Sequence, residues 1–230
     1  MTAASFIDTE LSPIRKIIGG RMDAGWAVPK VSITVEAQTD ELSTALVALS
    51  LRHSPVKTTL FDAILLAVAR SLRAHPAMNS ALFEGKQRTF EAINLGFAVN
   101  LPQGLFVPVI KDADRMSVVD IAKERAALTA RVRDGDFSSK VLGNGTFTLS
   151  NLGGFGVDFF SPILNVPQCG ILGVGTEKLR PVVSDGQVVA RRTTYLTLVF
   201  DHRLVDGAPA AAFLRDITQQ LVALTAEIGA

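Results

Sequence analysis

Strand-like and helix-like segments alternate along this chain, and tight turns join several of the strands, which together restrict the possible folds strongly. Residues 31–38 alternate between apolar and polar side chains, as a half-buried strand does. Residues 59–75 carry an apolar stripe at helical spacing and stop at Pro76. Asp185-Gly186, between two β-rich runs, indicates a hairpin. Because hairpins join antiparallel strands, a purely parallel sheet is excluded, and we expect one mixed α/β domain over residues 1–230.

The remaining elements follow from capping residues, turn residues and hydrophobic periodicity. Ser12-Pro13 predicts the start of a helix, with Ser12 as N-cap and Pro13 at the first helical position. Ser117, three residues before Asp120, resembles a capping box and predicts a helix that ends near Gly135. Further helices are expected over 40–51 and 209–228, and strands over 93–100, 106–110, 145–150, 168–174 and 193–200.

Composition restricts the class of protein. Apolar residues make up 48% of the 230 residues, which predicts a large core and favours an additional buried subunit interface. Lys plus Arg number 23 against 22 for Asp plus Glu, so nothing suggests nucleic acid or an anionic membrane as a partner. The single Cys169 permits no internal disulfide and no Cys-based metal cluster. Residues 60–69 are too short to span a bilayer, and residues 1–10 lack an apolar signal core, so a soluble intracellular protein is expected.

His202 is the strongest candidate for acid–base chemistry. It follows a strand-forming run and precedes Asp206-Gly207 and a predicted helix, so it would project from a defined edge. Neutral imidazole is well suited to taking a proton from a thiol near pH 7. From these residues alone, a structural role for His202, in the core or as a helix cap, is an equally good interpretation. The other two histidines are interpreted as structural, since His53 lies in a polar loop and His75 ends a helix.

Three further side chains have both a chemical and a structural interpretation. Asp206 could pair with the imidazole or hold the loop by an ion pair with an arginine, or it could be an ordinary turn aspartate before Gly207. Ser150 ends a strand before a Gly-rich turn, where its hydroxyl could donate to an oxyanion or simply serve the turn. Cys169 could be a nucleophile, but its apolar neighbours favour a buried, inert thiol.

The segment from Phe200 to Gly207 resembles the His-x-x-x-Asp-Gly motif of the E2 acyltransferase catalytic domain of 2-oxoacid dehydrogenase complexes. Chloramphenicol acetyltransferases and peptide-synthesis condensation domains share this motif. Other segments that resemble the E2 family narrow the match. They are Leu11-Ser12-Pro13-Ile14-Arg15-Lys16 with Arg21-Met22, residues 106–114, Gly145-Thr146-Phe147-Thr148-Leu149-Ser150-Asn151-Leu152-Gly153, and residues 161–168. The match covers nearly the whole chain in the family's order.

The resemblance implies a mixed sheet flanked by helices, the chloramphenicol acetyltransferase-like fold, assembled as a homotrimer. Active sites would lie between subunits, with coenzyme A and dihydrolipoamide entering from opposite ends of a channel. It implies that His202 is the general base, that Ser150 faces the oxyanion from a different chain, and that Asp206 orients the loop by a salt bridge, for which Arg15 is the candidate. Lys111 is a candidate for binding the phosphates of coenzyme A. No metal is implied.

The chain departs from the family pattern in two respects. It shows no lipoyl domain, no peripheral-subunit-binding domain and no linker, so an excised core or a stand-alone acyltransferase is expected. In the first case the lipoyl group and the other 2-oxoacid dehydrogenase components would come from another domain or chain. The end at residues 226–230 lacks the apolar anchor of the large cores, which leaves the trimer as the expected unit, with a higher-order core possible.

Three functions are consistent with these residues. The first is transfer of an acyl group, with acetyl favoured over succinyl by Ser150-Asn151-Leu152-Gly153, between dihydrolipoamide and coenzyme A. The alternative is a stand-alone acetyl-CoA-dependent enzyme that acts on a small hydroxyl or amine acceptor. The third is a non-catalytic scaffold. The expected location is the cytoplasm, or the mitochondrial matrix in a eukaryote.

Overall fold

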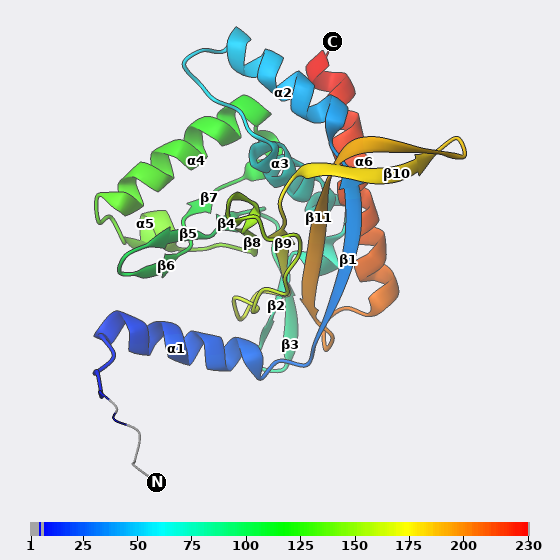
Figure 1. Ribbon diagram of the computed structural model, residues 1–230. Coiled ribbons are helices and arrows are strands. Elements are labelled where there is room, and N and C mark those ends of the chain that lie inside the picture. The colour runs from blue at the N-terminus through cyan, green and yellow to red at the C-terminus, as the bar shows by residue number, and fades with distance from the viewer. Residues whose placement is uncertain (1–4, 6, 230) are drawn as a thin grey trace.

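The structure is a computed structural model that describes residues 5 and 7–229. Its main sheet has the strand order β1-β11-β9-β8-β4-β7, with β10 paired to β11 (Figure 1). The pairs β4–β8 and β8–β9 are parallel and the others are antiparallel. The strands are β1 (Lys30–Gln38), β4 (Leu95–Phe97), β7 (Val109–Ile110), β8 (Phe147–Asn151), β9 (Gly170–Val174), β10 (Lys178–Ser184) and β11 (Gln187–Asp201). The expected mixed sheet is therefore confirmed.

The main core lies between this sheet and four helices. These are α2 (Asp40–Arg52), α3 (Leu60–Ala74), α4 (Val118–Arg133) and α6 (Gly207–Gly229). The helix α1 (Pro13–Trp26) lies apart from them, along the lower edge of the molecule in Figure 1, and α5 (Ser139–Leu142) is a single short turn. Within the described residues, no helix has both the length and the apolar character needed to cross a membrane.

The capping signals in the sequence are confirmed. The Ser12 hydroxyl accepts a hydrogen bond from the backbone N–H of Arg15 and begins α1. Ser117 and Asp120 form a reciprocal capping box at the start of α4. The same device begins α3, where the backbone N–H of Thr59 donates to Asp62 at 2.8 Å. These bonds satisfy N–H groups that the first turn of a helix leaves without partners.

Three expected strands differ in extent from the structure. The run 106–110 divides between β6 (Gly104–Phe106) and β7, which belong to different sheets. The run 93–100 divides between β4 and β5 (Val99–Leu101), because β4 joins the main sheet whereas β5 forms a separate hairpin with β6 (Gly104–Phe106). The strand expected over 193–200 is the second half of β11, which continues from the β10 hairpin without a break. Its two halves pair with different partners, since β10 covers the first half and β1 and β9 the second.

One hairpin was not predicted. Strands β2 (Ser80–Phe83) and β3 (Lys86–Thr89) are joined by Glu84 and Gly85, both of which have positive φ. Two central residues with positive φ suit the right-handed twist of a two-residue hairpin, and Gly85 adopts that conformation without steric cost. The strand β3 is exposed along its whole length, so its sequence lacks the alternation that marks a half-buried strand.

Candidate active site

His202 lies directly after the buried end of β11, in the turn that leads to α6. Its backbone N–H donates to the carbonyl oxygen of Pro29 at 2.9 Å, which fixes this turn to the start of β1. The side chain is 42% exposed, and its ring centroid lies 5.7 Å from that of Phe200. The imidazole is therefore held on rigid backbone while its nitrogens remain accessible, as a proton-transfer residue requires.

A neighbouring ion pair, which no sequence motif predicted, holds the same turn. The Asp201 carboxylate is buried and accepts hydrogen bonds from the guanidinium of Arg203 at 2.9 and 2.6 Å and from the backbone N–H of Arg203 at 3.0 Å. These contacts raise the pKa of Arg203. The only signal in the sequence was two opposite charges flanking His202, which an exposed turn would also show.

Asp206 extends away from the fold. Its side chain is 85% exposed, and its Oδ1 lies 3.7 Å from Nδ1 of His202, a separation too long for a hydrogen bond. Among the described residues, Arg15 makes no ion pair with Asp206. Arg15 lies exposed on α1, so one chain does not bring the predicted salt bridge together.

Ser150 lies near the carboxyl end of β8, opposite Gly173 of β9. Its side chain is half-buried, and no hydrogen bond within the described residues engages its hydroxyl. The loop that follows is fixed by Asn151, whose side-chain oxygen accepts from the backbone N–H of Gly153 at 2.8 Å. The Ser150 hydroxyl is thus free to donate to a ligand, while the backbone on both sides of it is held.

The sheet register separates Ser150 from His202 within one chain. Ser150 is opposite Gly173, which in turn is opposite Thr197. Thr197 precedes His202 by five residues, or about 17 Å along the strand, and the two intervening strand spacings add roughly 10 Å across the sheet. One copy of this chain therefore cannot place both side chains on one substrate atom.

The remaining reactive side chains lie elsewhere. Cys169 is fully buried, and burial raises the pKa of its thiol to about 12, so it stays protonated at neutral pH. His75 is the C-cap residue of α3, as expected, whereas His53, which was expected in a polar loop, is the C-cap residue of α2. Lys111 is exposed beyond the edge strand β7, four strands from β11 and thus about 19 Å across the sheet.

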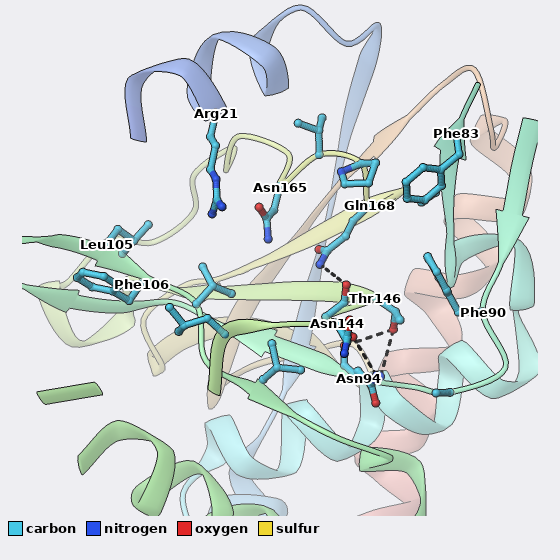
Figure 2. A pocket seen from close by; sticks show the side chains of 18 of the residues that line it. Arg21, Phe83, Phe90, Asn94, Leu105, Phe106, Asn144, Thr146, Asn165 and Gln168 are labelled. Atoms are coloured by element: carbon cyan, nitrogen blue, oxygen red, sulfur yellow. Dashed lines mark hydrogen bonds between the residues drawn. The ribbon is translucent and has the colours of Figure 1, made fainter. Parts of the chain in front are cut away.

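A cavity of about 960 Å³ opens between α1 and the sheet, and we call it the α1 pocket. Its lining includes Ile17 and Arg21 of α1, Phe83 of the β2–β3 hairpin, Leu105 of β6, and Gln168 just before β9. Figure 2 shows Arg21 reaching from α1 into the pocket, while Gln168 lies at its centre. The pocket lies at the same end of the sheet as His202, although His202 does not line it.

Comparison with known proteins decides the family. Residues 3–227 match the model of the 2-oxoacid dehydrogenases acyltransferase (catalytic domain). The chain belongs to this family. A relative of the acyltransferase domain is the dihydrolipoyllysine-residue acetyltransferase component of the acetoin cleaving system of Bacillus subtilis, 38% identical over 206 residues. The match covers 88% of this chain and 52% of that protein, so the chain spans about half the length of this relative.

Solved structures of acyltransferase domains share the fold. Dihydrolipoamide acetyltransferase from Azotobacter vinelandii has a TM-score of 0.92 and 32% identity, covering 97% of this chain and 94% of the other. A chloramphenicol acetyltransferase superimposes with a TM-score of 0.56 at 16% identity, over 94% of this chain and 99% of the other, which confirms the expected fold type.

The Azotobacter vinelandii enzyme was studied for the roles of a serine, a histidine and an asparagine in its catalytic mechanism. The histidine follows the serine there at the same separation as His202 follows Ser150 in this acyltransferase domain. The asparagine lies four positions beyond the histidine, where this chain has Asp206. The residue four positions after the histidine therefore carries an amide in the Azotobacter vinelandii enzyme and a carboxylate in this chain.

Proposed function

We propose that this chain catalyses transfer of an acetyl group between the dihydrolipoyl thiol and coenzyme A. The observation that carries the proposal is the exposed imidazole of His202 on a turn held by Pro29, Asp201 and Arg203. The shared separation of Ser150 and His202 with the serine and histidine studied in the Azotobacter vinelandii acetyltransferase supports it. Acetyl is favoured because that enzyme and the Bacillus subtilis relative are both acetyltransferases.

In the proposed mechanism, His202 accepts the proton of the attacking thiol as its sulfur bonds to the thioester carbonyl carbon. A thiol has a pKa of about 8.5 and imidazole about 6.5, so transfer at the moment of attack is feasible. The carbonyl oxygen becomes an oxyanion, to which Ser150 donates its hydroxyl proton in a hydrogen bond. When the intermediate collapses, the carbon–sulfur bond to the other thiolate breaks, and that sulfur takes the proton from His202. One preorganised oxyanion donor lowers the barrier by roughly 3 kcal/mol.

The site requires two copies of the chain, since the register keeps Ser150 about 20 Å from His202 in one copy. Exposed apolar side chains support an interface beside Ser150. Phe155 and Phe159, in the loop after β8, are 74% and 64% exposed, and Leu179 of β10 is 62% exposed. We infer a homotrimer with three such sites, in which Asp206 reaches Arg15 only across a subunit boundary.

Several finer points belong to the same proposal. Coenzyme A is a substrate, and the lipoyl group comes from another domain or chain of a 2-oxoacid dehydrogenase complex. Lys111 is proposed to contact the phosphates of coenzyme A, for which its exposed ammonium is the supporting feature. A higher-order core built from trimers is proposed by analogy with the cubic core of the pyruvate dehydrogenase multienzyme complex. The proposed location is the cytoplasm, or the mitochondrial matrix in a eukaryote.

The test is a His202→Ala variant assayed with acetyl-CoA and dihydrolipoamide. Loss of the general base is expected to lower kcat by about 10²- to 10⁴-fold. His53→Ala is the matched control, because it removes an exposed imidazole that ends a helix away from β11. Unchanged turnover in His202→Ala would overturn the proposal, as would a small hydroxyl or amine acceptor that reacts while dihydrolipoamide does not.

A further inference from the structure

The loop of residues 152–162, which we call the serine loop, follows Ser150 and ends beside it. Gly173 of β9 is the register partner of Ser150. A Cβ atom on Gly173 would lie 3.2 Å from Cζ of Phe160 and 3.2 Å from Cδ of Pro162. Since partners in adjacent strands point to the same face of a sheet, Phe160 and Pro162 cover the face on which the Ser150 side chain lies. The position of this loop therefore decides what surrounds the proposed oxyanion donor.

The serine loop depends on other parts of the chain for a fixed position. Three of its first five residues are glycines, so its backbone has little intrinsic preference for one conformation. Its near end is held by the backbone N–H of Gly153, which donates to Asn151. Its far half is held by a hydrogen bond from the backbone N–H of Thr176 to the carbonyl oxygen of Val157, and by the side chains of the next two residues.

Arg180 of β10 holds that far half through Asp158. Its Nη2 donates to Oδ1 of Asp158 at 2.7 Å, and its Nη1 donates to the carbonyl oxygen and the hydroxyl of Thr193 at 2.6 and 2.9 Å. The guanidinium lies 4.7 Å from the ring centroid of Tyr195, against which Phe159 packs edge-on. The Arg180 side chain is only 10% exposed. One nearly buried cation thus joins the serine loop to β11.

A second cation contacts the same carboxylate but is more exposed. Nζ of Lys178 lies 2.8 Å from Asp158, and its side chain is 49% exposed, so solvent weakens this pair. Hydrogen bonds from Lys178 and Arg180 lower the pKa of Asp158, which is therefore ionised at neutral pH. Lys178 makes a matched control for Arg180, because the two differ in burial and share one acceptor.

We propose that Arg180 is a positioning residue for acyl transfer: through Asp158 it fixes the serine loop, and thereby keeps the surroundings of Ser150 preorganised for the oxyanion. The inference rests on the proposed function, because it takes Ser150 to be the oxyanion donor. Misplacement of a catalytic group by about 1 Å can lower the rate by about 100-fold, so a fixed loop is valuable here. The planar guanidinium serves Asp158 and Thr193 at once, which the ammonium of a lysine cannot do.

The first measurement is steady-state acetyl transfer between acetyl-CoA and dihydrolipoamide by the whole protein. Arg180→Gln is expected to lower kcat by about tenfold or more and to change either KM by less than about twofold, because the oxyanion exists only near the transition state. Asp158→Ala leaves the bonds from Arg180 to Thr193 in place and should give a similar loss. Arg180→Lys should recover only part of the rate, and Lys178→Gln should keep kcat within about twofold of wild type.

The second measurement follows the loop without turnover. Tyr195 is the only tyrosine, so a fluorinated tyrosine gives one fluorine NMR resonance, from the ring that contacts Arg180 and Phe159. Asp158→Ala is expected to shift or broaden this resonance although Arg180 stays on the ring, whereas Lys178→Gln should leave it unchanged. The double variant of Arg180→Gln and Asp158→Ala should lose little more activity than either single variant, because both remove one contact.

Wild-type kcat in Arg180→Gln and Asp158→Ala would overturn the inference, as would an unchanged fluorine resonance in Asp158→Ala. A change in KM alone would also overturn it, since that would indicate a role in ground-state binding. If Arg180→Gln does not fold, Asp158→Ala decides, because that side chain is 40% exposed. Failure of the proposed function is distinct, since it would appear as no acetyl transfer by the wild-type protein.

Discussion

The three histidines of this chain show how strongly backbone context decides what a side chain can do. His53 and His75 end helices, and His75 packs edge-on against Phe213 with a centroid separation of 5.7 Å. Only His202 combines an accessible ring with a turn that is tied to a second strand and to a buried carboxylate. The buried Asp201 is thus a positioning residue for the imidazole, through the turn that it shares with Arg203.

The contact proposed between Asp206 and Arg15 of a neighbouring copy is expected to need an acceptor oxygen at this position more than a negative charge. Asp206 is 85% exposed and 3.7 Å from the imidazole, so solvent screens its charge, and the Azotobacter vinelandii enzyme has an asparagine at this spacing. We predict that Asp206→Asn keeps kcat/KM within about threefold of wild type, a cost below 1 kcal/mol in the barrier. Steady-state kinetics with acetyl-CoA and dihydrolipoamide measure this. A loss comparable to that of His202→Ala would show that the carboxylate charge itself is needed.

At the scale of the elements, a buried ion pair joins α3 to α4. The side chain of Asp62 is completely buried, and Oδ1 and Oδ2 accept from Nε and Nη2 of Arg125 at 2.5 and 3.1 Å. The same carboxylate accepts from the backbone N–H and the hydroxyl of Thr59 at 2.8 and 2.6 Å. One carboxylate therefore begins a helix and also fixes the neighbouring helix against it.

Removing this carboxylate should cost much more than removing an exposed one with the same capping role. Asp62→Ala leaves Arg125 and the N-terminus of α3 without their acceptor, so we predict a loss of about 3 kcal/mol in the free energy of unfolding. Asp120→Ala removes the equivalent acceptor of α4, whose side chain is 57% exposed, and should cost about 0.3–1.5 kcal/mol. Urea denaturation at one fixed protein concentration compares the two. Equal losses would show that the contact with Arg125 contributes nothing.

The elements also show which sequence signals were sufficient. Ser12, Ser117 and the apolar stripe of α3 predicted their helices because capping and amphipathic periodicity are local properties. The continuity of β11 was missed because Arg191 and Arg192 interrupt its apolar run, although both pair with β10 in the ladder. The exposed β3 was missed because neither of its faces is buried.

At the scale of the whole molecule, the site should be shared between copies. Co-expression of Ser150→Ala and His202→Ala chains in equal amounts should restore activity that neither variant has alone. With random mixing, about a quarter of the interfaces combine an intact serine with an intact histidine, so up to about a quarter of wild-type turnover is expected. The measurement is the specific activity of the mixed oligomer beside that of each variant by itself. No recovery in a well-mixed oligomer would contradict a site shared between subunits.

The sequence by itself determined the mixed α/β class, most helix boundaries, and the choice of Ser150 and His202 as candidate site residues, because caps, periodicity and short motifs are encoded over a few neighbouring residues. Only the tertiary structure decided that those two side chains lie at distant points of one sheet, that Asp201 rather than Asp206 is the buried carboxylate of the turn, and that Arg21 reaches into a cavity. These facts depend on strand order and register. Such pairings join residues far apart in the chain, so local sequence patterns do not determine them.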